Sequence, residues 1–241
     1  MHVDDALRAR YPQAVGLVTD IHHACVALAI KVCQSVNLGA THSWRPVHTR
    51  SKLPGTLSGA VLAGGQGQRM GGVNKGLVTH NGRYLFEYAV NNLRPHVSDL
   101  VIVTNTCLER YQALGYEAID DGRFRGCGPL AGLHAALRHA KTPFVAIAPC
   151  DQGPLPEGVY PRLYAAAEQS TSGAAVLSVD GRCHPTTAVL GVVLAGALFS
   201  SLQSGRFRLI QWCEAISAVE VSCPGLEFQN YNTPQDLATD T

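Results

Sequence analysis

Apolar and polar positions alternate in blocks along most of this chain, from residue 57 onward. Short apolar runs are followed by longer segments in which apolar positions recur at helical spacing. The expected strands cover 57–63, 100–104, 117–119, 143–148 and 174–179, and the expected helices cover 84–93, 108–114, 129–139 and 159–169. Strands that alternate with helices form a mostly parallel sheet flanked by helices. We therefore predict an α/β fold.

The first part of the chain has a different pattern. Residues 14–38 have the composition of a helix, and residues 41–55 are polar and contain two prolines, as a linker does. We predict an N-terminal appendage of helix and linker over 1–56, with no assigned function, and one domain over 57–241.

Composition limits the classes of partner. The chain has 241 residues, of which 46% are hydrophobic and 15% are charged, so it can bury a full core. A net charge of +1 gives no general surface for nucleic acid or for an anionic membrane, and we expect neither as a partner. Eight scattered cysteines, without a Cys-x-x-Cys pair, indicate reduced thiols and a cytoplasmic location. No apolar run near the start is long enough to predict a membrane span.

A glycine-rich loop follows the first expected strand, and it carries Arg69 and ends at Lys75. Glycines let backbone N–H groups approach phosphate oxygens closely. The arginine fork can grip two of these oxygens, and the lysine adds a point charge suited to a leaving pyrophosphate. The loop therefore predicts phosphoryl or nucleotidyl chemistry, although a plain strand-to-helix turn also uses glycine.

Two better-known phosphate loops do not fit. A P-loop has Ser or Thr after its lysine, whereas Lys75 is followed by Gly76. A dinucleotide-binding loop has a third glycine where this chain has Met70.

Acidic residues follow two other expected strands. Asp151 comes just after the apolar run 144–148, where one carboxylate beside a phosphate loop is sufficient to hold Mg²⁺; the alternative is a turn aspartate that opens a helix. Cys150 is expected to be a packed thiol rather than a nucleophile. Asp120 and Asp121 follow strand 117–119, and because adjacent side chains on an extended chain point to opposite sides, only one should face the site. Asp121 could bind a ribose or support magnesium.

Ligands in open α/β sheets bind beyond the carboxyl ends of the strands. The glycine loop, Asn105, Asp121 and Asp151 all follow expected strands, so they should converge on one crevice. Pro129 should lie in the first turn of a helix whose amino end can receive an anion.

Several short motifs occur in a characteristic order between residue 57 and about residue 238. They are Leu62-Ala63-Gly64-Gly65 with Arg69-Met70-Gly71-Gly72 and Lys75-Gly76, then Gly128-Pro129-Leu130-Ala131-Gly132, Pro149-Cys150-Asp151, His184-Pro185-Thr186 and Asn230-Tyr231-Asn232-Thr233-Pro234. With these motifs the chain resembles the molybdenum cofactor guanylyltransferases. The resemblance implies a Rossmann-like three-layer nucleotidyltransferase fold.

The resemblance also implies a reaction, in which the terminal phosphate of molybdopterin attacks the α-phosphorus of GTP and pyrophosphate leaves. GTP and the molybdenum cofactor are then the partners, with Mg²⁺ as cofactor, and cofactor-delivery or acceptor proteins are possible further partners. The implied catalytic residues are Arg69, Lys75 and Asp151, with Asp151 as the Mg²⁺ ligand. The implied nucleotide site is Leu62, Ala63, Gly64, Gly65, Lys75, Asp121 and Asp151, and the implied cofactor side is His184, Asn230 and Asn232.

The chain departs from the family at two positions. The family often has an acidic residue where this chain has Asn74, and an Asn-x-Asn where it has Val103-Thr104-Asn105. We expect the first change to remove a carboxylate near the phosphates, and the second to affect one contact to the nucleotide.

Alternatives therefore stay open. A related nucleotidyltransferase could use another base or acceptor, as the CTP:molybdopterin cytidylyltransferase does, and a non-catalytic GTP-binding module could bind GTP without turnover. His184 could simply be held in a turn by Pro185. Arg206 and Arg208 could meet an anionic cofactor or form a solvated basic face.

Overall fold

The structure, a computed structural model, describes residues 57–64, 74–227 and 229–231. The predicted appendage over 1–56 lies outside these residues, so the domain boundary stays a prediction. Gly65, Arg69 and Asn232 also lie outside them.

The described part of the chain contains a seven-stranded sheet in the order β5-β4-β1-β6-β8-β7-β9. Its strands are β1 (Leu57–Leu62), β4 (Leu100–Val103), β5 (Glu117–Ile119), β6 (Phe144–Pro149), β7 (Ala174–Val179), β8 (Arg182–Gly191) and β9 (Val219–Ser222). Within this sheet, β8 runs antiparallel to both of its neighbours, and the other pairs are parallel. The predicted mostly parallel sheet is confirmed.

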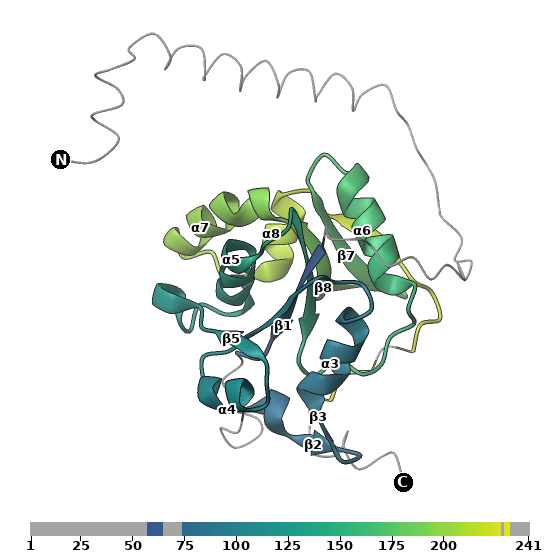
Figure 1. The fold of residues 1–241 in the computed structure, drawn as a ribbon. Coiled ribbons are helices and arrows are strands. Elements are labelled where there is room, and N and C mark those ends of the chain that lie inside the picture. Colours follow the sequence, from purple (N-terminus) through teal and green to yellow (C-terminus); the bar gives the residue numbers. More distant parts are fainter. Residues whose placement is uncertain (1–56, 65–73, 228, 232–241) are drawn as a thin grey trace, which may run out of the picture. The chain divides into compact units, whose positions relative to one another are not determined.

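Helices cover both faces of the sheet, which makes three layers (Figure 1). On one face lie α3 (Leu85–Leu93), α4 (Leu108–Ala113) and α6 (Val159–Gln169), and on the other lie α5 (Pro129–His139), α7 (Ala195–Gln203) and α8 (Leu209–Ala215). The described residues also contain three short 3-10 turns, η2 (Lys75–Leu77), η3 (Gly122–Phe124) and η4 (Val192–Leu194). Two short strands, β2 (Thr79–His80) and β3 (Arg83–Tyr84), form a small hairpin. The predicted α/β fold is therefore confirmed.

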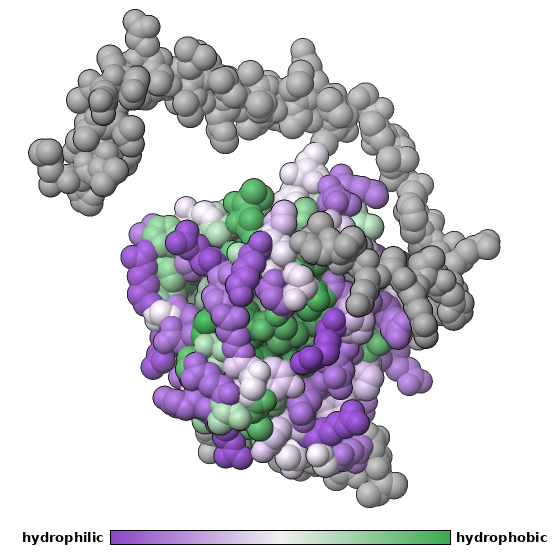
Figure 2. Space-filling view, viewed as in Figure 1, coloured by the Kyte–Doolittle hydropathy of each residue, from purple (hydrophilic) through white to green (hydrophobic). Residues whose placement is uncertain are grey.

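Side chains of the central strands alternate between two apolar clusters. Val61 of β1 and Ala148 of β6 pack toward α3 and α6, whereas Ala60 and Ile147 pack toward α5. Successive residues of a strand point to opposite faces, so a strand buried on both faces is apolar throughout. The helices turn their polar sides outward, and hydrophilic residues cover most of the face shown in Figure 2, with hydrophobic ones visible mainly toward its middle.

The strands and helices predicted from the sequence are all present, and their ends differ by one residue at most. The prediction missed the hairpin strands β2 and β3, and it missed β8, α7 and β9. β8 begins with a polar stretch that contains Pro185, and the register of its pairing with β7 shifts beside this stretch, between Val176 and Leu177. Proline is tolerated in a strand at such an irregularity, because no ladder hydrogen bond is required of it there. His184 thus lies in a strand, and the alternative of a turn held by Pro185 is wrong.

Candidate functional site

Lys75 and Asp151 are in direct contact, although they are far apart in the sequence. Lys75 is the first residue of η2, and Asp151 follows the carboxyl end of β6. Lys75 Nζ lies 2.5 Å from Asp151 Oδ2, and the two side chains are 18% and 19% exposed. Solvent still reaches part of both side chains, so a ligand can approach them. The structure therefore brings together the cation and the carboxylate that the sequence singled out.

The turn that carries Asp151 is anchored in the core by its next residue. Gln152 is fully buried, and its Nε2 donates a hydrogen bond of 2.6 Å to Thr187 Oγ1 on β8. Tyr160 of α6 donates from its hydroxyl to Gln152 Oε1 at 3.4 Å. Neither Gln152 nor Thr187 was predicted from the sequence. The one available signal was a glutamine directly after a strand-end aspartate.

A segment near the C-terminus runs beside the same turn. The backbone N–H of Tyr231 donates to the carbonyl of Asp151 at 3.0 Å, and Asn230 forms an antiparallel bridge with Gln152. Asn230 Oδ1 is buried and has no hydrogen-bond partner among the residues that the structure describes. The predicted cofactor-side residue Asn230 is thus next to the Asp151 turn.

The end of β1 lies between the Asp151 turn and Asn105. Leu62 O accepts a hydrogen bond of 3.0 Å from Cys150 N–H, and Ala63 N–H donates to Val103 O at 2.8 Å. Gly64 is exposed, and a Cβ at this position would lie 3.6 Å from Asn105 Nδ2. Leu62, Ala63 and Gly64 therefore lie at the centre of the strand ends, as a nucleotide-binding loop requires.

Asp120 and Asp121 have different surroundings. Asp121 is 9% exposed, and its Oδ2 accepts a hydrogen bond of 2.8 Å from Asn105 Nδ2. Its Oδ1 is buried with no hydrogen-bond partner in the described ranges. Asp120 is more exposed, accepts from Gly122 N–H at 2.9 Å and lies 3.7 Å from Arg125. Asp121 alone thus offers a buried acceptor, which suits an N–H or O–H donor of a ligand.

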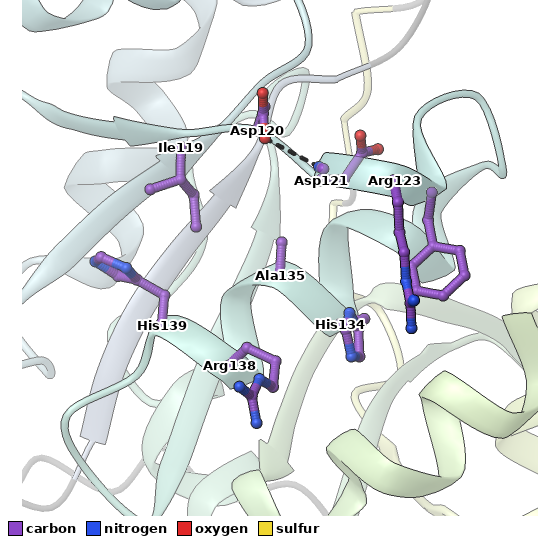
Figure 3. A pocket seen from close by; sticks show the side chains of 10 residues that line it. Ile119, Asp120, Asp121, Arg123, His134, Ala135, Arg138 and His139 are labelled. Carbon is purple, nitrogen blue, oxygen red and sulfur yellow. Dashed lines mark hydrogen bonds between the residues drawn. The ribbon is translucent and has the colours of Figure 1, made fainter. Parts of the chain in front are cut away.

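A groove of about 370 Å³ lies beside Asp121, between η3 and α5 (Figure 3). Arg123 of η3 and His134 and Arg138 of α5 line it, and Figure 3 shows the three side chains on one side of the two aspartates. Burial lowers the pKa of His134, and the nearby Arg138 and Arg123 lower it further. The groove therefore adjoins the site at Asp121 and has a basic wall.

The amino end of α5 lies beside an exposed Arg-Phe-Arg segment. Gly128 precedes the helix with φ +75°, which glycine adopts readily, and Pro129 occupies the first turn as predicted. A Cβ on Gly128 would lie 3.8 Å from the carbonyl oxygen of Phe207, and Arg206 and Arg208 are exposed. These arginines thus flank the helix end whose free N–H groups can receive an anion.

His184 and Cys150 are the remaining candidates. β8 is antiparallel to β6 and pairs with it from Ala188 onward, so its first residues, His184 among them, extend past the carboxyl end of β6 toward the side that carries Asp151. Burial and then Arg182 lower the pKa of His184. Cys150 is buried, and burial, followed by the charge of Asp151, raises its pKa to about 12, so it is a packed thiol as expected.

A three-layer α/β sheet with a glycine loop after its first strand and a lysine–aspartate pair at the strand ends defines a protein of the nucleotidyltransferase class. The model of one family, the MobA-like NTP transferase domain, matches residues 59–216, and this chain belongs to that family.

Curated relatives agree with this assignment. The chain is 40% identical over 182 residues to a molybdenum cofactor guanylyltransferase of Yersinia pestis, which covers 75% of this chain and 92% of the relative. A molybdenum cofactor guanylyltransferase of Yersinia pseudotuberculosis is 39% identical over the same length.

Solved structures share the fold. Molybdopterin-guanine dinucleotide biosynthesis protein A from Archaeoglobus fulgidus superposes with a TM-score of 0.60 at 27% identity, over 75% of this chain and 95% of that chain. The 2-C-methyl-D-erythritol 4-phosphate cytidylyltransferase of Thermus thermophilus, at 20% identity, has a TM-score of 0.57 over 76% and 96% of the two chains. Among the described helices, none is long and apolar enough to cross a membrane.

Proposed function

We propose that this chain transfers GMP from GTP to the terminal phosphate of molybdopterin and releases pyrophosphate. The observation that carries the proposal is the 40% identity to a molybdenum cofactor guanylyltransferase over 92% of that relative. The ion pair of Lys75 and Asp151 supports it, because nucleotidyl transfer needs positive charge and a metal-binding carboxylate near the phosphates. GTP and molybdopterin are the proposed partners, and the cytoplasm is the proposed location.

In this proposal the nucleotide lies along the end of β1. Backbone groups of Leu62, Ala63 and Gly64 line its path, and Lys75 Nζ moves from Asp151 to the phosphate oxygens. The buried Oδ1 of Asp121, which has no hydrogen-bond partner among the described residues, accepts a hydrogen bond from an N–H of the guanine. Arg69, outside the described residues, is proposed to grip the phosphates as the sequence suggests.

The residues present fit Mg²⁺. No group of three His, Cys, Asp or Glu side chains that could hold a metal occurs in the described part of the chain, and Asp151 is one partly exposed carboxylate. A single carboxylate suits Mg²⁺, which takes its other ligands from water and substrate phosphates. When bound, Mg²⁺ neutralises charge on the phosphates. Asp151 is the proposed ligand.

The chain's own residues act by positioning and by charge. Lys75 stabilises the negative charge that develops on the leaving pyrophosphate, and the anchored Asp151 turn keeps the phosphates in place. His184, Asn230 and Asn232 are the proposed contacts on the molybdopterin side. No covalent intermediate with the protein is required.

The test is pyrophosphate release from GTP, with CTP and ATP in parallel, in the presence of Mg²⁺ and molybdopterin. We expect release from GTP, and we expect Asp151→Asn to lower kcat by at least about a hundredfold while the fold is kept. Glu214→Gln is the matched control, since it also replaces a carboxylate by a carboxamide, at an exposed position of α8 outside the proposed site.

The other outcomes are informative. Release from CTP in place of GTP indicates a nucleotidyltransferase with another base, and tight GTP binding without release indicates a non-catalytic module. Full activity of Asp151→Asn contradicts the assignment of the metal ligand.

A further inference from the structure

Asn74, the residue before Lys75, uses its whole side chain in contacts within the protein. It is 6% exposed. Its Oδ1 accepts from Gly76 N–H at 3.1 Å and from the Tyr111 hydroxyl at 2.8 Å. Its Nδ2 donates to Thr104 Oγ1 at 3.2 Å, to Thr106 O at 3.2 Å and to Thr106 Oγ1 at 2.9 Å. The carboxamide thus joins three separate segments of the chain.

The hydrogen bonds that Asn74 Oδ1 accepts help to orient Lys75. Asn74 is the N-cap of η2, and its side chain accepts from the backbone of Gly76, so it sets the start of the turn whose first residue is Lys75. Gly76 fits closely here, because a Cβ at this position would overlap the Tyr111 hydroxyl. The cap therefore determines the direction in which Lys75 leaves the backbone toward Asp151.

The hydrogen bonds that Asn74 Nδ2 donates connect it to the part of the site around Asn105 and Asp121. Thr104 and Thr106 flank Asn105, whose Nδ2 donates to Asp121 at 2.8 Å. Thr104 also donates to the carbonyl of Thr106 at 2.7 Å, which closes the turn on itself. The single turn 104–106 therefore holds Asn74 with its two threonines and Asp121 with its asparagine.

We infer that Asn74 is a positioning residue, whose carboxamide sets Lys75 and ties it through the turn 104–106 to Asp121. This inference rests on the proposed function, in which Lys75 meets the phosphates and Asp121 meets the base. Fixing Lys75 relative to Asp121 helps to hold the phosphates and the base of one bound nucleotide in a single arrangement. A displacement of about 1 Å at such a site lowers rates by as much as a hundredfold.

The position favours an amide over a carboxylate. The carbonyl of Thr106 has no proton to give, so a carboxylate oxygen in place of Nδ2 faces another acceptor at 3.2 Å in a buried environment. The Tyr111 hydroxyl that donates to Asn74 is also neutral, since burial raises its pKa. In this chain the side chain at position 74 is engaged by Thr104, Thr106 and Tyr111. That the asparagine removes a carboxylate from near the phosphates stays a prediction.

The experiment compares Asn74→Ala with the wild-type full-length chain. We expect kcat for pyrophosphate release to fall by about tenfold or more, with a smaller change in KM for GTP. In parallel, the acetylation rate of the Lys75 amine, measured by mass spectrometry without substrate, should rise severalfold relative to that of the exposed Lys141. Asn74→Asp, which keeps an acceptor but loses the Nδ2 donor, should also lower kcat. Asn91→Ala, at an exposed position of α3, is the control and should change neither quantity.

The outcomes separate the two proposals. If folded Asn74→Ala keeps both kcat and the acetylation rate of Lys75, the positioning role is overturned. If the wild-type chain releases no pyrophosphate, the proposed function fails, and the acetylation rate still tests whether Asn74 positions Lys75. If Asn74→Ala shows no cooperative melting, Thr106→Val takes its place; it removes only the contact at 2.9 Å and should shift the same readouts by about twofold to threefold. Unchanged readouts in Thr106→Val then overturn the inference.

Discussion

Charged and neutral groups lie side by side where β6 ends. Asp151 is charged and paired with Lys75, whereas the preceding Cys150 is buried, with a pKa raised to about 12 mainly by burial. A thiol with such a pKa is almost entirely protonated at neutral pH and is therefore a poor nucleophile. Cys150 serves packing, and the chemistry is left to the lysine and the aspartate.

This difference predicts the reactivity of the cysteines. In the folded protein at about pH 8, iodoacetamide should modify the exposed Cys107 at least about tenfold faster than Cys150. Peptide mass spectrometry at several reaction times measures both rates. In urea the two cysteines should react alike, which controls for local sequence effects. Equal rates in the folded state would contradict the packed position of Cys150.

Elements distant in the sequence meet at the Asp151 turn. The segment 229–231 pairs with residues 151–153, and Tyr231, which is 3% exposed, packs on His80 with ring centroids 4.7 Å apart. The ring of Tyr88 in α3 also lies nearby, with its centroid 6.1 Å from that of the Tyr231 ring. The aromatic contact holds the segment where its backbone supports Asp151.

We therefore expect Tyr231→Ala to lower both stability and activity. Loss of a buried aromatic ring should lower the free energy of unfolding by about 3 kcal/mol, measured by urea denaturation. It should also lower kcat, because the Tyr231 N–H to Asp151 O hydrogen bond loses its anchor. Tyr231→Phe keeps the ring and should retain most of both. A Tyr231→Ala variant with normal kcat would show that the segment does not support the site.

The pH dependence of folding belongs to the whole molecule. His96 is 7% exposed, and its Nδ1 has no hydrogen-bond partner within the described part of the chain. Burial lowers its pKa below the ordinary 6.5, although Glu157 opposes this. The pKa values of His134 and His184 are also lowered by burial. Below about pH 6.5 the unfolded chain then binds more protons than the folded chain, so stability is complete above this pH and falls as the pH decreases.

The prediction is a melting temperature that falls by about 3 °C or more between pH 7.5 and pH 5.5. In His96→Asn the fall should be smaller, because the side chain that must stay neutral in the folded state is gone. Differential scanning calorimetry in buffers of equal ionic strength measures both curves. Parallel curves for the two proteins would contradict a role of His96.

Much of the fold could be predicted because its signals are local. The apolar run 144–148 and the helical spacing over 129–139 depend on near neighbours in the chain, and both elements occur where expected. β8 could not be predicted in this way, since its polar beginning is stabilised by pairing with β7. The different orientations of Asp120 and Asp121 were predictable from strand geometry, but the hydrogen bond from Asn105 to Asp121 was not.

The sequence by itself determined the order of the elements, the residue types at the strand ends and the family resemblance. Only the tertiary structure decided which of these residues touch. The Lys75–Asp151 pair, the contact of Asn74 with Thr104 and Thr106, and the support of Asp151 by Tyr231 each join segments far apart in the chain. The physical reason is that side-chain periodicity follows from neighbours in the chain, whereas these contacts depend on strand order and register across the whole sheet.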